Sequence, residues 1–476
     1  MSKVKVDFAK LDRAFNPRCV AVIGDSGNND FRWLRAQSTF TGKLYSVQVN
    51  PKTVEGIKAL GVENYTSLLD IPEAVDLAIV AVPRAVAHRV LQDCIRKEVA
   101  AAHFFTAGFS ETNSEEGREL ERRLTETAEQ ANFHLIGPNC MGIFNPRLGL
   151  RQNEGQYTGF AGPVGFISQS GNHAMNFSLL GHLQGVDINK SVSFGNGVVL
   201  DSADFLEYFS RDPEIKIIGM YLEGVKDGRR FFRVLREVSA RKPVIILKGG
   251  RTGGGERAIA SHTGSLAVPQ AIWEAAMRQC GAISVANMDE LVDTVKALLH
   301  LAPVRSKRVG IIGGSGGQSV AVADAFGEAG LELPPLTRQS YDELATFWTL
   351  IGGGYPNPID TGNDNRKEIK RILEILERDT NIDNLVLLIL LMPGNAANTA
   401  QLENSINLMV DMRKKTLKPL MAITTFFTNE DMQQARDVTQ KLEGGGVPTF
   451  HTIERGARAL RNALRYYRFR GTVEGV

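Results

Sequence analysis

The sequence predicts an α/β protein built from doubly wound parallel sheets. Short apolar runs alternate with longer amphipathic segments along the chain, which is the pattern of strands followed by crossover helices. Several of the apolar runs end in glycine or in a polar turn, as strands of buried parallel sheets commonly do. The chain has 476 residues, which is long enough for about three domains of ordinary size.

The composition is that of a soluble globular protein, with 43% hydrophobic and 23% charged residues. A formal net charge of +2 gives no reason to expect nucleic acid as a partner. The four cysteines are widely spaced and form no C-x-x-C pair, so we expect neither a disulfide framework nor a metal site. No apolar run reaches transmembrane length, and we expect a cytoplasmic protein that does not associate with membranes.

The first predicted domain, residues 1–149, contains an α/β pattern with a ligand site at one edge of its sheet. Its predicted strands lie at residues 19–24, 42–50, 74–83 and 101–108, and its clearest helices at 85–96 and 114–130. Doubly wound sheets bind ligands at the carboxyl ends of their strands. The candidate cofactor contacts are therefore the residues that follow these strands, namely Gly24, Ser26, Asn50, Lys52, Pro83, Gly108 and Phe109.

The first of these loops argues against a plain NAD-dependent enzyme. Its sequence, Gly24-Asp-Ser-Gly-Asn-Asn-Asp30, lacks the G-x-G-x-x-G fingerprint, and no acidic residue ends the second strand to bind a ribose hydroxyl. Lys52 lies near that position instead, which suits a ligand with an additional phosphate. Coenzyme A and NADP both remain possible at this point.

The second predicted domain, residues 150–304, begins with an anion-binding turn. An apolar strand precedes Ser170 and Gly171, and a helix follows them. The first N–H groups of such a helix lack internal partners and carry partial positive charge, so we predict phosphate binding at these two residues. Residues 193–201 are predicted to form a strand that ends in a polar turn, and a further strand is followed by the carboxylate of Glu223.

A glycine-rich stretch closes this domain's set of strand-end loops. It begins at Lys248 and ends at His262, just before a helix predicted to start near Val268. Glycines allow a backbone to approach a phosphate closely, and a neutral imidazole is a nucleophile that can accept a phosphoryl group. Local chemistry alone leaves open that His262 is only a polar loop residue and Glu223 only a solvated acid.

The third predicted domain, residues 305–476, repeats the anion-binding turn. Ser170 aligns with Ser315 and Gly171 with Gly316 without a gap, and Gly317 follows, so we predict a second phosphate site there. Predicted strands at 385–391, 419–425 and 447–451, with helices between them, indicate a second flavodoxin-like unit.

The order of these motifs resembles that of the NDP-forming acyl-CoA synthetases, in particular the α-type subunit of ADP-forming acetyl-CoA synthetases, which are related to succinyl-CoA synthetase. Nearly the whole chain takes part in the resemblance. The motifs that carry it are Val20-Ala-Val-Ile-Gly24, Val49-Asn-Pro-Lys52, Ala81-Val-Pro83, Thr106-Ala-Gly-Phe-Ser-Glu111, Gly137-Pro-Asn-Cys-Met-Gly142, Tyr221-Leu-Glu-Gly224, Ser261-His-Thr-Gly-Ser-Leu266 and Asn357-Pro-Ile-Asp360.

The resemblance implies a Rossmann-like CoA-binding domain followed by two flavodoxin-like, succinyl-CoA-ligase-like domains. In that family the histidine matching His262 is phosphorylated, and the glutamate matching Glu223 orients and assists it. The two anion turns begin the helices that hold the phosphoryl group. The resemblance adds three residues to the coenzyme A contacts: Val82, Asn139 and Cys140.

This chain departs from the family pattern at two places. The family usually has Gly-Ala-Ser after the first strand, whereas this chain has Gly24-Asp25-Ser26 and then an unusual Asn-Asn-Asp-Phe-Arg-Trp. Asp25 would repel a phosphate placed beside it. Val268 replaces a residue that is usually glycine.

The resemblance also implies a partner. We find neither a nucleotide-grasp fold, which would need about 220 further residues, nor a Walker sequence. We therefore expect a hetero-oligomer in which a β-type nucleotide-grasp subunit binds ADP or ATP with Mg²⁺. The expected reaction interconverts acyl-CoA, ADP and phosphate with carboxylate, coenzyme A and ATP through acyl phosphate and phosphohistidine.

Three other functions stay open at this stage. A non-catalytic sensor of coenzyme A or acyl-CoA would keep the fold but would need neither His262 nor Glu223 nor the anion turns. An acyl or carbamoyl transferase that uses acyl phosphates without ATP would fit the lack of a nucleotide domain. An NADP-dependent oxidoreductase would leave the histidine motif and the repeated turns unexplained.

Overall fold

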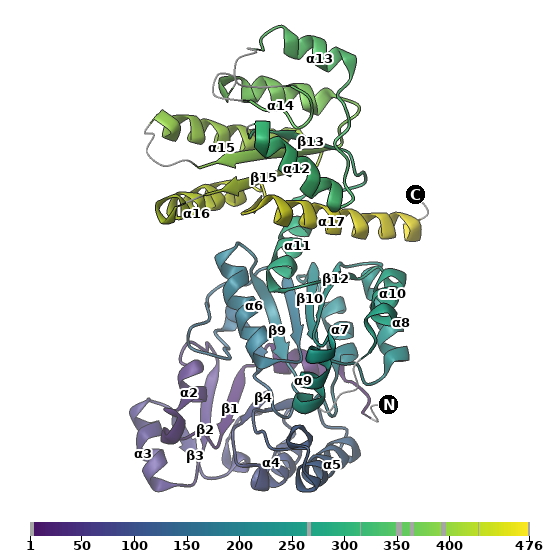
Figure 1. Ribbon diagram of the computed structural model, residues 1–476. Coiled ribbons are helices and arrows are strands. Elements are labelled where there is room, and N and C mark those ends of the chain that lie inside the picture. Colours follow the sequence, from purple (N-terminus) through teal and green to yellow (C-terminus); the bar gives the residue numbers. More distant parts are fainter. Residues whose placement is uncertain are drawn as a thin grey trace. The chain divides into compact units, whose positions relative to one another are not determined.

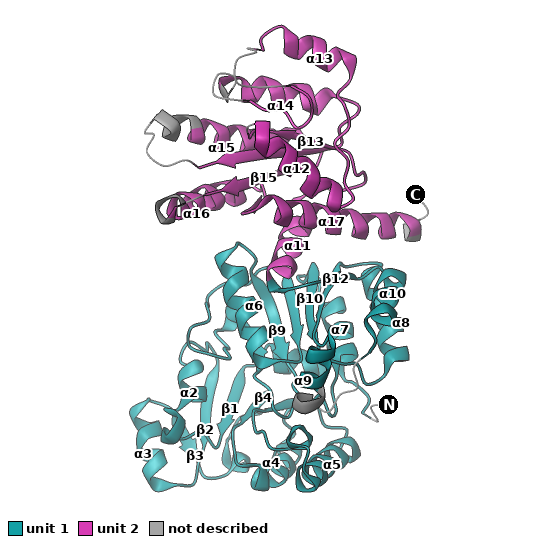
Figure 2. Ribbon diagram, viewed as in Figure 1, with its two compact units in different colours: residues 1–288 teal, residues 289–476 magenta. Residues whose placement is uncertain are grey.

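The computed structural model describes residues 4–263, 268–314, 316–348, 355–361, 366–391, 397–426 and 428–474. The chain forms two compact units, residues 1–288 and 289–476, which Figure 2 shows in different colours. The first unit contains two six-stranded sheets, and the second contains one four-stranded sheet (Figure 1). In the part of the chain that the structure describes, no helix is long and apolar enough to cross a membrane.

The first sheet has the strand order β3-β2-β1-β4-β5-β6, and each neighbouring pair is parallel. This is the order typical of Rossmann folds, in which the ligand crevice opens where the strand order reverses, here between β1 and β4. The strands are β1 (Cys19–Ile23), β2 (Lys43–Val47), β3 (Glu63–Tyr65), β4 (Leu77–Val80), β5 (Ala101–Phe104) and β6 (Leu135–Ile136). The helices between them are α2 (Arg32–Ala36), α3 (Pro51–Ala59), α4 (Arg84–Arg96) and α5 (Glu115–Gln130), with a 3₁₀ turn η3 (Ser110–Thr112) before α5.

The second sheet has the order β12-β11-β10-β8-β9-β7. Counted from β8, its parallel strands follow the flavodoxin-like order, which reverses between β8 and β10, while β7 joins β9 in antiparallel fashion. The strands are β7 (Gly142–Phe144), β8 (Val164–Ser168), β9 (Ile188–Ser193), β10 (Ile217–Leu222), β11 (Val244–Lys248) and β12 (Ile283–Val285). The helices are α6 (Gly171–Leu183), α7 (Ser202–Arg211), α8 (Gly228–Ser239), α9 (Gly253–Thr263) and α10 (Gln270–Cys280).

One hydrophobic core joins the two sheets of the first unit. Helix α1 (Phe8–Phe15) contributes Phe15, whose ring packs edge-on against Phe205 and Phe209 of α7 at centroid distances of 6.3 and 5.5 Å. The hydroxyl of Tyr208 donates to the Asp12 carboxylate at 3.1 Å. The carboxyl-end loops of the two sheets therefore belong to one packed body.

The second unit contains one parallel sheet in the order β13-β14-β15-β16. The sheet continues on the other side of β13 through two isolated parallel bridges, Arg308 to Glu332 and Ile312 to Ile359. This matches a flavodoxin-like arrangement. The strands are β13 (Val309–Ile312), β14 (Asn384–Leu390), β15 (Leu420–Thr425) and β16 (Thr449–Phe450). The helices are α11 (Met288–His300), α12 (Gly316–Glu328), α13 (Arg338–Ala345), α14 (Ile369–Arg378), α15 (Ala397–Lys415), α16 (Asn429–Gly444) and α17 (Ile453–Glu474).

The predicted strand at residues 193–201 is wrong, because the strand there is β9, which ends at Ser193. Strand β9 was not predicted because its sequence is more polar than that of a typical buried strand: Ile188-Asn-Lys-Ser-Val-Ser193. Lys190 is only 6% exposed and forms an ion pair with Asp212, so its charge can be accommodated inside a buried strand. The following residues form a turn in which Gly195 and Gly197 have positive φ.

The glycine-rich stretch is also more helical than predicted. Helix α9 begins at Gly253 and includes residue 262. Thr252 caps it: the Thr252 hydroxyl accepts the N–H of Gly255 at 3.2 Å, and its carbonyl accepts the N–H of Glu256 at 2.8 Å. This cap offsets the poor helix propensity of the three glycines, and α10 follows from Gln270.

Candidate functional site

The two loops at the crevice of the first sheet touch each other through Gly24. Its φ is +85°, and a Cβ atom there would lie 2.4 Å from Val82 Cγ1 and 3.1 Å from the carbonyl oxygen of Ala81. A side chain would be both strained and overlapped, so glycine is required. The loop after β1 and the loop after β4 therefore pack against each other at Gly24.

Asp25, the departure from the family pattern, is bound to the start of helix α2. Its carboxylate accepts the N–H groups of Ser26 at 3.0 Å and of Trp33 and Leu34 at 2.9 Å each, and the side chain is 1% exposed. Burial raises the pKa of Asp25, while these hydrogen bonds favour its charged form. Asp25 therefore caps α2, and its negative charge neutralises the positive end of that helix.

The loop after β2 presents Asn50 and Lys52 at the same edge of the sheet. The Asn50 side chain accepts the N–H of Lys52 at 3.0 Å and so caps α3. The N–H groups of Val49 and Asn50 donate to the Gln48 side chain at 2.8 and 3.1 Å. Lys52 is exposed in the first turn of α3, where a phosphate in solution could reach it.

The loop after β5 is held from within the protein. The N–H groups of Gly108 and Phe109 donate to Glu111 Oε1 at 2.6 and 3.1 Å, and the Phe109 side chain is 1% exposed in the core. Asn196, from the other sheet, donates to Glu111 Oε2 at 2.8 Å. Burial opposes ionisation of Glu111, but the hydrogen bonds from Asn196 and the loop outweigh it and lower its pKa. The predicted contacts of Gly108 and Phe109 with coenzyme A therefore stay predictions, and neither N–H is unbound here.

A cavity of about 240 Å³ lies within the first unit and is lined from both of its sheets. It brings together two predicted coenzyme A contacts, Asn139 and Cys140, with the two residues of the first anion turn, Ser170 and Gly171. Its described lining is completed by Arg32, Phe105, Met141, Gln169, Asn172, Gly195 and Asn196. Cys140 is buried, which raises its pKa to about 12, so its thiol is not a nucleophile at neutral pH.

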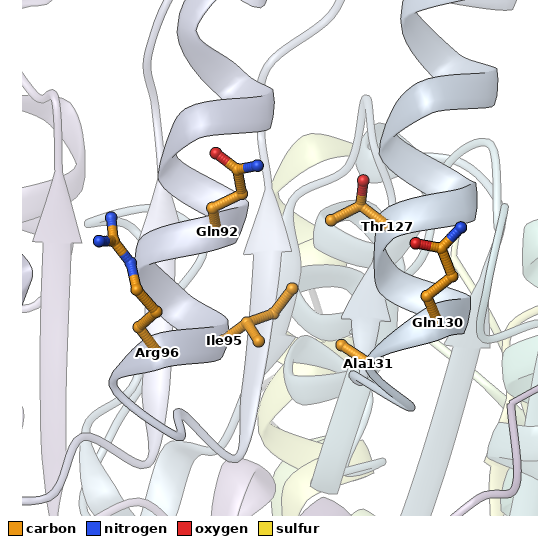
Figure 3. Close-up of a pocket in the computed structure, with 6 residues that line it drawn as sticks. All are labelled: Gln92, Ile95, Arg96, Thr127, Gln130 and Ala131. Carbon is orange, nitrogen blue, oxygen red and sulfur yellow. The ribbon is translucent and has the colours of Figure 1, made fainter.

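A larger hollow of about 560 Å³ lies between the last turns of α4 and α5 (Figure 3). Those turns lie near the amino ends of the strands, because each helix runs back across the sheet. None of the predicted site residues that the structure describes lines this hollow. Its described lining consists of Gln92, Ile95, Arg96, Thr127, Gln130 and Ala131.

The anion turn after β8 has the geometry that its sequence predicts. Ser170 is the N-cap of α6, and its hydroxyl lies 3.5 Å from the N–H of His173. The Ser168 hydroxyl accepts the N–H of Ser170 at 3.2 Å and so shapes the turn. Gly171 begins the helix, with Met141 packed so closely that a Cβ on Gly171 would lie 2.4 Å from Met141 Cγ.

Glu223 follows β10 and lies at the crevice of the second sheet, next to this turn. It is 5% exposed, so the interpretation as a solvated acid is wrong. The Gln169 side chain accepts the N–H of Glu223 at 2.8 Å, and the Tyr221 hydroxyl donates to Glu223 Oε1 at 3.3 Å. His173 stacks on Tyr221 with a centroid distance of 3.8 Å. Burial lowers the pKa of His173, against the opposing charge of Glu223.

The structure describes only some of the remaining predicted site residues. The backbone at residue 262 belongs to the last turn of α9, which packs beside η3, but the His262 side chain lies outside the described part. Ser315 also lies outside it. Gly316 and Gly317 begin α12 in the second unit, where the Asp360 carboxylate is 3.7 Å from the Cβ position of Gly316. The roles of His262, Ser315, Gly316 and Gly317 stay predictions.

Two residues of the site were missed from the sequence. Lys248 ends β11, is 2% exposed, and donates to the carbonyls of Gly249 and Gly250 at 3.0 and 3.2 Å, which holds the glycine-rich loop. Burial lowers its pKa. Arg32 lies in the unusual segment after the first strand, and that segment was the available signal. Among the described residues, no group of three or more His, Cys, Asp or Glu side chains is arranged to hold a metal ion.

Two family models match the chain. A family model described as a CoA binding domain matches residues 18–146. A second model, described as a succinyl-CoA ligase like flavodoxin domain, matches residues 161–298.

Curated relatives and a solved structure match nearly the whole chain. The α subunit of ADP-forming acetate–CoA ligase II from Pyrococcus furiosus is 36% identical over 460 residues, covering 94% of this chain and 96% of the subunit. ADP-forming acetate–CoA ligase I from Archaeoglobus fulgidus is also 36% identical, but this chain spans only 64% of its length. The acetyl-coenzyme A synthetase 1 of Ca. Korarchaeum cryptofilum, solved with phosphate and ADP, superposes with a TM-score of 0.83 and 28% identity over 98% of each chain.

Proposed function

The chain belongs to the family of ADP-forming acetate–CoA ligases, and from that premise we propose that it is the CoA-binding, phosphohistidine-bearing subunit of such an enzyme. One observation carries the proposal. The start of α6 at Ser170 and Gly171 shares a cavity with Asn139 and Cys140 of the CoA-binding sheet. A phosphate on the helix start would therefore lie beside an acyl group delivered from the first sheet.

In the first step, phosphate held at the start of α6 attacks the acyl carbonyl carbon of the bound thioester. The C–S bond breaks, coenzyme A leaves and takes up a proton, and acyl phosphate forms. The helix N-terminus supports this step because its N–H groups stabilise negative charge without having to reorient.

In the second step, an imidazole nitrogen of His262 attacks the phosphorus, and the bond to the acyl oxygen breaks to release the carboxylate. We assign Glu223 to the other imidazole N–H, where its carboxylate fixes the tautomer and supports the positive charge that develops. The burial of Glu223 strengthens such a pairing, since less water competes for it. We also assign phosphate binding to the second anion turn, at Ser315, Gly316 and Gly317.

The third step needs a partner. We propose that a separate β-type subunit with a nucleotide-grasp fold supplies ADP with Mg²⁺ and takes the phosphoryl group from His262. The match to a relative that is itself an α subunit, 36% identical to this chain, supports this proposal.

The proposal is tested by mixing the chain with phosphate and a series of short acyl-CoA thioesters, without nucleotide. Phosphate-dependent release of the free thiol is expected with at least one thioester, and ATP should form only when ADP and a β-type subunit are added. Coenzyme A binding without thiol release from any thioester would instead identify a sensor. Thiol release without transfer to ADP by any β-type subunit would favour an ATP-independent acyl transferase.

A further inference from the structure

We propose that Arg32 binds a second anionic group on the acyl chain, so that the preferred substrate is a short acyl group ending in a carboxylate. This inference rests on the proposed function and names the substrate class of the same site. It starts from the segment in which the chain departs from the family pattern after its first strand.

Arg32 lines the cavity, and no described residue pairs with its charge. Its Nε atom is buried and makes no hydrogen bond with any described residue. Its Nη2 atom contacts the Met141 sulfur at 3.6 Å, which is a weak acceptor. Within the described residues, no carboxylate lies within ion-pair distance of Arg32, and none of the side chains that line the cavity is acidic.

The position of the guanidinium is nevertheless defined. Arg32 begins α2, and its guanidinium carbon lies 5.5 Å from the ring centroid of Phe105 and 5.9 Å from that of Trp33. Contacts with aromatic faces offset part of the cost of burying the cation, but they leave its N–H groups free to donate. A planar fork with free donors is the group that proteins use for bidentate carboxylate binding.

The geometry separates this position from the phosphate position at the start of α6. Met141 lies against Gly171 and also meets the guanidinium through its sulfur. A group on Arg32 and a group on the helix start are therefore set apart by the Met141 side chain. Two anion-binding features in one cavity fit an acyl phosphate whose acyl chain carries its own anion at the far end.

The size of the cavity limits the chain between the two anions. About 240 Å³ is below the range of pockets for drug-sized ligands, so the acyl group is restricted to a few carbons. A short acyl group that ends in a methyl would leave the guanidinium unpaired beside the positive helix start. A terminal carboxylate would pair with the guanidinium and so remove the free-energy cost of leaving this charge unpaired.

The test compares two thioesters of equal carbon number, succinyl-CoA and butyryl-CoA, by calorimetric titration of the full chain. The wild type should bind succinyl-CoA about tenfold or more tightly than butyryl-CoA, the ratio expected for one charge-assisted pair. Arg32→Met should reverse the preference, because it removes the pair and presents an apolar end to the butyryl chain. Arg32→Lys, which keeps the charge but not the fork, should retain a weaker preference for succinyl-CoA.

Arg35→Met is the matched control. Arg35 lies on the same helix, pairs with Asp30 at 3.1 Å and does not line the cavity, so the succinyl preference should be unchanged. Equal binding of the two thioesters by the wild type would overturn the proposal. So would a loss of inorganic phosphate binding in Arg32→Met with the thioester ratio intact, which would assign Arg32 to the phosphate. Phosphorylation of His262 by acetyl phosphate reports on the proposed function separately and should persist in every Arg32 variant.

Discussion

Replacing Gly24 with alanine tests whether the crevice between β1 and β4 depends on the close packing of the loops that follow these strands. The added methyl would lie 2.4 Å from Val82 Cγ1 and 3.1 Å from the carbonyl of Ala81, at a φ of +85°. The unfavourable φ costs about 1–2 kcal/mol, and overpacking beside the main chain adds about 1–3 kcal/mol. We therefore expect Gly24→Ala to lower the free energy of unfolding of the first unit by about 2–5 kcal/mol.

Gly61 supplies the matched control. Its φ is also positive, at +74°, but no atom of the described residues lies within 4 Å of its Cβ position. Gly61→Ala should therefore cost only the conformational penalty, about 1–2 kcal/mol. The difference between the two variants isolates the close approach of the two loops.

Both variants are compared by urea unfolding, followed through the fluorescence of Trp33, a fully buried residue of α2. Coenzyme A affinity is measured by calorimetry under conditions in which each variant is folded. Gly24→Ala should weaken coenzyme A binding because it forces the loops after β1 and β4 apart, whereas Gly61→Ala should not. Equal destabilisation by the two substitutions, or full coenzyme A affinity in Gly24→Ala, would refute this reasoning.

Two further predictions concern pH and cofactor choice. Burial lowers the pKa of His103 from its usual value of 6.5 to about 3. Between these two pH values His103 binds a proton in the unfolded chain but not in the folded chain. The contribution of neutral His103 to stability is present above pH 6.5 and should fall by about 1.4 kcal/mol per pH unit below that value. His103→Leu should therefore flatten the dependence of the urea unfolding midpoint on pH between pH 7 and 5. An unchanged slope in His103→Leu would contradict this prediction. Lys52 should contact the 3′-phosphate of coenzyme A, worth about 1.5–3 kcal/mol. Lys52→Met should therefore bind coenzyme A and dephospho-coenzyme A equally, and equal affinities already in the wild type would remove that role.

The sequence predicted the parts of the fold that depend on local pattern. Strands such as β1, β10 and β14 are buried along most of their length, so their apolar runs were clear signals. Strand β9 was misplaced because Lys190 is neutralised by Asp212, a residue that is distant in sequence. Strands β3, β6, β7 and β12 have two or three residues each and carry too little periodicity to be recognised.

In the candidate site, too, features set by local sequence could be predicted, and features set by contacts between distant residues could not. The turn at Ser170 and Gly171 could be predicted because a strand, a tight turn and a helix start are adjacent in sequence. Arg32 was missed as a site residue because its role depends on how the two sheets pack, which places it beside Met141. The helical backbone at residue 262 was missed because the cap at Thr252 outweighs the glycines that follow it.

The phosphorylation of His262 is the central claim, and labelling the full chain with acetyl phosphate that carries radioactive phosphorus tests it most directly. No partner is needed for this half-reaction. The label should be acid-labile and base-stable, should map to His262, and should disappear in His262→Ala while coenzyme A binding is kept. Glu223→Gln should slow labelling strongly, because it keeps the shape but loses the charge that supports the imidazolium. A label that persists in His262→Ala, or that maps to His173 in the first turn of α6, would contradict the account.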